Sequence, residues 1–173
     1  MSAVHRILSA LLVLAAILPA IAIGNNAAAR ASDSPGGDLW EMADCAFLVG
    51  VRCFDVQDAA SWAERVTAWK FPGPAWNNQG DAFRHCAWMG ALSTRVGIDA
   101  AIGVGEIHEK HNPGPESERL MDLSNNETGA WIGNEALLSG TSDTWGYVMN
   151  HCEQLAKDGR LAGLDGIPGN WQE

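Results

Sequence analysis

Residues 80–97 read GDAFRHCAWMGALSTRVG, a helical pattern that ends at a glycine. Small and apolar side chains occupy most of its faces, as is typical of a helix buried inside a bundle. One face is different, because four side chains with polar groups recur there at i, i+3, i+4 and i+7: Asp81, Arg84, His85 and Trp88. Such a face is either a satisfied polar core or an active site. We predict a helix over 80–96, capped by Gly97.

The rest of the sequence predicts further helices around this one. Apolar side chains recur at helical spacing, between Pro- and Gly-rich breaks, over 38–48, from 55 or 58 to 70, over 99–111 and over 142–157. In the second of these, Trp62, Val66 and Trp69 should face the core. A short helix over 116–123 should bend at Asn125 or Asn126 into a helix ending near residue 138.

The absence of sustained alternation with β-branched residues after the leader favours an all-α fold. We expect a compact single-domain bundle of about five to six helices. An irregular Gly-rich tail over 161–173 should follow it, packing Leu161, Leu164 and Trp171.

The beginning of the chain is typical of an export signal. Residues 7–23 are apolar except for Ser9 and a proline, and Ala-Arg-Ala at 29–31 precedes Ser32 as a cleavage site. We expect 1–31 to be a signal peptide, 32–37 a flexible leader and 38–173 one helical domain of an exported protein, periplasmic or secreted. An uncleaved anchor is the alternative, but the apolar run is short for a spanning helix. We therefore expect no stable membrane insertion after cleavage.

The charge of the mature chain excludes some partners. Cleavage would leave 142 residues with nine basic and 21 acidic side chains, a net charge of −12. Phosphate backbones and anionic membrane surfaces repel such a protein, so we expect no nucleic-acid partner. Small substrates and cations remain compatible with this charge.

Four cysteines, all after residue 31, suggest two disulfides in an exported chain. Three pairings are possible. We favour a local Cys45–Cys53 loop and a long-range Cys86–Cys152 bridge. The alternative is a zinc cluster, which the absence of a C-x-x-C pair disfavours.

A second group of polar residues follows at 106–111, where the sequence reads EIHEKH. Its H-E-x-H order lacks the four-residue histidine spacing of the zinc motif H-E-x-x-H. His108 and Glu109 are the functional candidates, whereas His111 borders a Pro-Gly loop and should be more exposed. Asp122 offers a metal ligand, an acid or base, or a partner that orients a histidine. Asn125 and Asn126 can bind substrate or cap the next helix.

Three blocks of this region carry a resemblance: Gly80-Asp-Ala-Phe-Arg-His85 with Trp88, then Glu106-x-His108-Glu109, then Met121-Asp122-Leu-x-Asn125-Asn126-x-x-Gly129. In this order they resemble a family of bacterial domains of unknown function found in exported and surface proteins, over about 77–132, the motif core. Two positions depart from that pattern. Cys86 stands where the family usually has alanine, and Ser124 where a histidine is frequent. The resemblance implies which residues matter and supplies no reaction.

The first hypothesis for function is a hydrolase that acts on a cell-envelope component such as peptidoglycan or lipid. His85 would act as general base with Asp81 or Asp122 orienting its ring, or a divalent metal such as zinc would activate water. The catalytic candidates are His85, Asp81, Arg84 and Glu109. The substrate-binding candidates are Trp88, Asn125 and Asn126, and the metal-ligand candidates are His85, His108 and Asp122.

The second hypothesis is a non-catalytic module. The same residues would then form a buried hydrogen-bond and ion-pair network that fixes the helix packing. A binding or immunity-type role toward a protein partner in the envelope belongs to this class.

Overall fold

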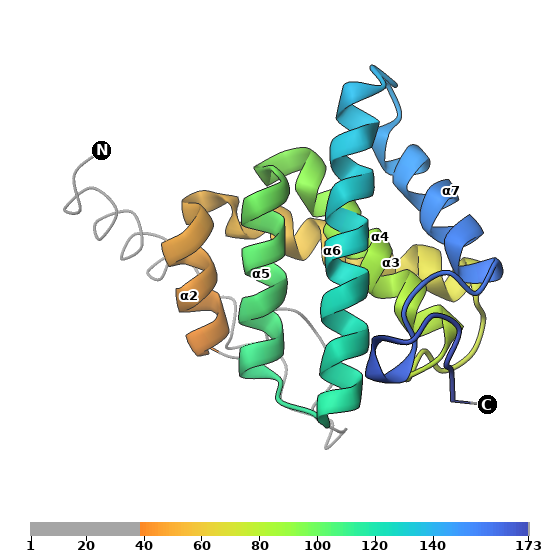
Figure 1. Cartoon of the computed structure of the whole chain (residues 1–173). Coiled ribbons are helices and arrows are strands. Elements are labelled where there is room, and N and C mark those ends of the chain that lie inside the picture. Colours follow the sequence, from red (N-terminus) through yellow and green to blue (C-terminus); the bar gives the residue numbers. More distant parts are fainter. Residues whose placement is uncertain (1–38, 173) are drawn as a thin grey trace.

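The computed structural model describes residues 39–172, and this part of the chain is helical (Figure 1). Its six α-helices are α2 (Leu39–Val49), α3 (Cys53–Lys70), α4 (Gln79–Val96), α5 (Ile98–His111), α6 (Glu116–Leu138) and α7 (Thr144–Lys157). Two short 3-10 helices are η1 (Gly50–Arg52) and η2 (Leu164–Gly166). The prediction of an all-α bundle is confirmed. The predicted signal peptide, 1–31, and leader, 32–37, lie outside the described residues.

α4 lies at the centre of the bundle. In Figure 1, α2, α5 and α6 run side by side, and α4 packs against α5, α6, α3 and α7. The Asn78 side chain caps its first turn by accepting hydrogen bonds from the backbone N–H groups of Gly80 and Asp81. Phe83, Trp88, Met89 and Leu92 are buried along its length. Asp81 and His85 on the same helix are therefore held inside the protein, whereas Arg95 near its end is exposed.

Glycines let α4 and α6 touch through their backbones. A Cβ at Gly129 would overlap the carbonyl group of Cys86, and one at Gly133 would overlap the carbonyl oxygen of Gly90. No other residue type fits these two positions without moving a helix. This contact brings the polar face of α4 within reach of side chains on α6.

The chain departs from the predicted helix pattern in three places. α6 runs without a bend through Asn125 and Asn126, because both side chains are buried in hydrogen bonds or packing instead of capping a new helix. α7 is capped by Asp143, which accepts from the N–H of Gly146 at 2.9 Å. Trp69 is 68% exposed, although its spacing predicted a core position; the ammonium of Lys70 lies over its ring.

Both predicted disulfides are present. Cys45–Cys53 joins the end of α2 to the start of α3, and Cys86–Cys152 joins α4 to α7. Because the second bridge spans 66 residues, it ties the motif core to the last helix. None of the helices over 39–172 is both long and apolar enough to cross a membrane.

The tail over 159–172 returns to the bundle as an irregular strap, as predicted. Leu161 is buried, and Leu164 and Trp171 are partly buried against the core. The side-chain amide of Asn125 holds the strap, since it donates to the carbonyl oxygen of Ala162 and accepts from its N–H, both at 2.9 Å. The tail thereby packs against the middle of α6.

Candidate functional site

A polar cavity of about 280 Å³ lies between α4, α5 and α6. Each helix contributes charged or ionisable side chains to its wall, together with residues of the two loops that precede α4 and α6. From the helices these are Asp81, Arg84 and His85, then His108, Glu109 and His111, then Glu118, Arg119 and Asp122. The cavity thus gathers most of the ionisable residues that the sequence singled out.

Three of these side chains form a cluster of metal-ligating type: His85, Glu109 and Asp122. One ligand atom from each lies within 4.8 Å of the other two, and each comes from a different helix. His85 Nε2 is 3.4 Å from Asp122 Oδ1. The predicted metal set was His85, His108 and Asp122, so Glu109 lies where His108 was expected.

The hydrogen bonds of His85 define its tautomer. Arg84 Nη2 lies 3.1 Å from His85 Nε2, and because a guanidinium can only donate, Nε2 must be the acceptor. The proton is then on Nδ1, which donates to Asn126 Oδ1 at 3.1 Å. His85 Nε2 therefore accepts the hydrogen bond of Arg84, and the ring lines the cavity.

Burial lowers the pKa of His85 well below its usual value of 6.5. The charge of Arg84 and the electrostatic interaction with His108 lower this pKa further, and the hydrogen bond to Asn126 only partly opposes them. The ring is thus neutral at neutral pH. A neutral imidazole is the form that binds a metal ion.

Asp81 supports Arg84 more than it supports His85. Its Oδ1 accepts from Arg84 Nη2 at 2.7 Å, but lies 3.8 Å from His85 Nε2, beyond hydrogen-bond length. Its Oδ2 accepts from the backbone N–H of Asn77 at 2.7 Å. The orienting role that the i, i+4 spacing predicted for Asp81 belongs instead to Asn126, from the facing helix.

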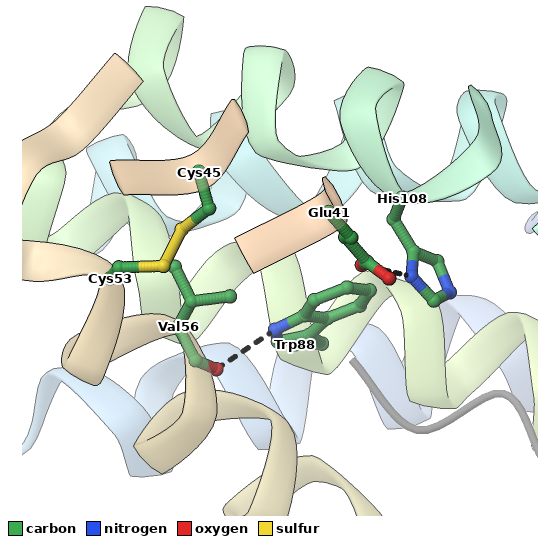
Figure 2. Close-up of a disulfide and its surroundings, with 6 residues drawn as sticks. All are labelled: Glu41, Cys45, Cys53, Val56, Trp88 and His108. Atoms are coloured by element: carbon green, nitrogen blue, oxygen red, sulfur yellow. Dashed lines mark hydrogen bonds and ion pairs between the residues drawn. A yellow bond between two sulfur atoms is a disulfide. The ribbon is translucent and has the colours of Figure 1, made fainter. Parts of the chain in front are cut away.

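His108 occupies a different part of the same cavity wall. Its Nδ1 is 2.8 Å from Glu41 Oε1, and Glu41 and His108 are both buried. The Trp88 ring meets the His108 ring edge-on, with 5.0 Å between centroids (Figure 2). Glu41 escaped the sequence analysis because 67 residues separate the two partners and no local motif links them.

His111 is not the exposed residue that its position beside a Pro-Gly loop predicted. Its side chain is 14% exposed, lines the cavity and pairs with Asp44 of α2 at 2.9 Å. Asn77 and Glu118, which the sequence analysis did not single out, also lie here. Asn77 Nδ2 donates to Glu118 Oε1 at 2.6 Å across the cavity rim.

The three predicted substrate-binding residues lie behind the cavity wall and do not line it. Trp88 is 1% exposed and its indole N–H donates to the carbonyl oxygen of Val56 on α3 at 3.3 Å (Figure 2). Asn125 holds the tail, and Asn126 holds the ring of His85. Helical spacing predicted that Trp88 shares a face with His85, but the sequence did not predict that α3 covers Trp88 and that the tail covers Asn125.

Comparison with known proteins gives a family and no solved relative. No solved structure matches the chain. The sequence model of a domain of unknown function, DUF6973, matches residues 45–159. The match contains α3 to α7 and the whole His85, Glu109 and Asp122 cluster, whereas Glu41 precedes it. Because it covers more than half of the 173 residues, the chain belongs to the DUF6973 family of domains of unknown function.

Proposed function

We propose that this protein is an exported hydrolase whose active site is the cavity between α4, α5 and α6, and that a divalent cation binds there to His85, Glu109 and Asp122. The substrate would be a component of the cell envelope. The observation that carries the proposal is the convergence of one imidazole and two carboxylates from three helices, within 4.8 Å of one another, in a polar cavity of about 280 Å³.

The contact between His85 and Asp122 supports a cation at this place. His85 Nε2 carries a lone pair and Asp122 Oδ1 is also an acceptor, yet the two atoms are only 3.4 Å apart. Two hydrogen-bond acceptors approach this closely where a nearby positive charge offsets the repulsion between them. The Arg84 guanidinium supplies that charge in this structure, and a divalent cation would supply more of it.

The donor set suits a transition metal of the zinc or manganese type. Imidazole nitrogen with carboxylate oxygens is a common ligand combination for these ions, at about 2.0–2.2 Å for zinc. Held by His85, Glu109 and Asp122, such an ion would lower the pKa of a water molecule and so supply a nucleophile at neutral pH. The residues themselves would do the rest: Asn126 holds the His85 ring through Nδ1, and Asp81 anchors the Arg84 guanidinium, which would give up Nε2 to the cation.

Arg84 is the candidate for binding negative charge. Hydrolysis of an ester, amide or phosphodiester develops charge on an oxygen, and a guanidinium held beside the reacting group stabilises it. With a volume of about 280 Å³, the cavity admits the group around a scissile bond and leaves the rest of a larger substrate outside.

Export is supported by the two disulfides, because such bonds form and persist in oxidising compartments. The apolar run near the start of the sequence agrees with this location. The envelope is then the place where the protein would meet its substrate.

One observation favours the non-catalytic alternative. A continuous chain of hydrogen bonds links α4 to α6 through Asn77, Asp81, Arg84, His85 and Asn126. Such a network can fix helix packing without any chemistry. In that case a protein partner would bind elsewhere on the surface.

Metal analysis of the protein purified without a histidine tag tests the cation site. We expect near-stoichiometric zinc or manganese in the wild type, strongly reduced metal content in Asp122→Asn, and a metal-dependent rise in melting temperature only where metal binds. Glu118→Gln is the matched control, because Glu118 is a carboxylate one turn earlier on α6 that lines the same cavity outside the cluster. Wild-type metal content in Asp122→Asn would reject the site.

The hydrolase itself is tested with phospholipids, peptidoglycan fragments and peptides offered to the metal-loaded protein. We expect turnover of one class, abolished in Asp122→Asn and retained in Glu118→Gln. If a folded, metal-loaded wild type hydrolyses none of them, the hydrolase proposal is rejected and the structural network is the better explanation.

A further inference from the structure

We infer that Glu41 is a positioning residue that holds His108 in the tautomer of a general base, so that His108 accepts the proton of the attacking water. This inference rests on the proposed hydrolase site and adds a residue to it. Glu41 lies on α2, before the part of the chain that the family match covers.

The contact between the two side chains is short and shielded. Glu41 Oε1 is 2.8 Å from His108 Nδ1, Glu41 is 6% exposed and His108 is 2% exposed (Figure 2). The Trp88 ring covers one side of the imidazole. A carboxylate that accepts from one ring nitrogen of a histidine fixes both the tautomer and the direction of the ring.

The neighbouring Asn112 identifies which atom carries the proton. Its Nδ2 lies near three atoms with which it could form a hydrogen bond. These are Glu41 Oε2 at 3.2 Å, the carbonyl oxygen of His108 at 3.0 Å and His108 Nδ1 at 3.1 Å. The amide has two N–H bonds, and the two oxygens satisfy both. His108 Nδ1 is then free to donate to Glu41, which leaves the lone pair on Nε2.

The ring that carries this lone pair lines the same cavity as the cluster. His108 lines the cavity, and its ring centroid is 6.4 Å from that of His85. In hydrolysis, Nε2 takes one proton from the water while the water oxygen bonds to the electrophilic centre. The imidazolium then returns the proton to the leaving group as the scissile bond breaks. The Glu41 side chain, hydrogen-bonded to Nδ1, stabilises the imidazolium.

α2 is anchored so that Glu41 keeps its place. The Cys45–Cys53 disulfide ties α2 to α3 one turn after Glu41 (Figure 2). Asp44, also on α2, pairs with Lys110 at 2.7 Å and with His111 at 2.9 Å on α5. Glu41 therefore acts on His108 from a helix attached on two sides.

The tautomer can be measured directly, without a substrate and without metal. Histidine ring nitrogen shifts in ¹⁵N NMR distinguish protonated from unprotonated nitrogens, and His108→Asn identifies the signals. At neutral pH with a chelator, we expect the wild-type His108 to carry its proton on Nδ1. In Glu41→Gln the neutral amide removes this preference, so the Nε2-protonated form should appear.

Asp44→Asn is the matched control, because it removes a carboxylate from the same helix that pairs with a different histidine of α5. It should change the signals of His111 and leave those of His108 unchanged. An Nε2-protonated His108 in the wild type, or an unchanged tautomer in Glu41→Gln, would overturn the inference. The wild-type spectrum alone can do so, even if Glu41→Gln does not fold.

Once a substrate is known, kinetics separate this inference from the function on which it rests. Glu41→Gln should lower kcat at least tenfold with little change in KM or metal content, and Glu41→Asp should recover part of the loss. Full activity in Glu41→Gln would reject the positioning role and leave the hydrolase intact. A wild type with the expected tautomer and no hydrolysis would reject the hydrolase.

Discussion

His85 is held as a neutral ring by two neighbours of different origin. Arg84, next to it in the chain, occupies Nε2, and Asn126, 41 residues away, occupies Nδ1. Gly105 of α5 allows this arrangement, since a Cβ there would come within 3.0 Å of the Asn126 amide. The state of His85 thus depends on residues of three helices.

The lowered pKa of His85 predicts a pH dependence of stability in the metal-free protein. The folded-state pKa lies below the unfolded value, which is near 6.5, because burial disfavours the charged ring. The contribution to stability is therefore complete above pH 6.5 and is lost as the pH falls toward the folded-state pKa. Urea unfolding at a series of pH values, with a chelator present, measures this loss.

His85→Gln should show a weaker decline than the wild type over the same range, since glutamine does not titrate. Parallel curves for the two proteins would show that another group causes the decline.

Some residues of the site could be identified from the sequence and others could not. His85, Arg84, Glu109 and Asp122 could be singled out because helical spacing and residue type point to one polar region. Glu41 could not, because its partner is distant in the chain. Asn125 was a candidate for substrate binding because of its residue type. In the structure the tail covers it, and the position of the tail could not be predicted from the sequence.

The pair α4 and α6 sets the geometry of the cavity. Backbone contact at Gly129 and Gly133 fixes the separation of the two helices, and Asp122 and Asn126 lie in the two turns that precede Gly129. α6 keeps 23 residues as one helix, because Asn125 and Asn126, where a bend was predicted, are buried within it.

Gly129→Ala should destabilise the protein by about 3 kcal/mol or more, because the added methyl group meets the backbone of Cys86, which cannot move aside. Denaturant unfolding measures the effect. Gly103→Ala is the control: its methyl group meets only the flexible end of Leu48 at 2.9 Å, and alanine favours a helix by about 1 kcal/mol. Equal stability of Gly129→Ala and the wild type would contradict the close contact.

At the scale of the molecule, the two disulfides should differ in their effect on stability. In the chain-entropy model, closing the 66-residue loop contributes about 4 kcal/mol and the eight-residue loop about 2.5 kcal/mol. We expect Cys86→Ala/Cys152→Ala to lower the melting temperature by about 10 °C and Cys45→Ala/Cys53→Ala by less. Calorimetry of both variants checks this order, and the reverse order would contradict it.

The fold class of residues 39–172 and the presence of two disulfides could be predicted from pattern and number, whereas the number of cysteines left three pairings open. Helical periodicity without alternation indicates an all-α bundle, and an even cysteine count indicates bridges. The burial of each helix face could not be predicted, because it depends on which neighbouring helix packs against that face. Trp69 remains exposed, while Trp88 with the same residue type is enclosed by α3 and α5.

The order of the bridges has a consequence for how the chain matures. The first cysteine pairs with the second and the third with the fourth, so the two loops neither overlap nor enclose each other. A chain that is oxidised while it emerges, N-terminus first, joins Cys45 to Cys53 before Cys86 appears, and Cys86 then meets only Cys152. Correct pairing therefore needs an oxidant alone, with no shuffling of wrong bonds.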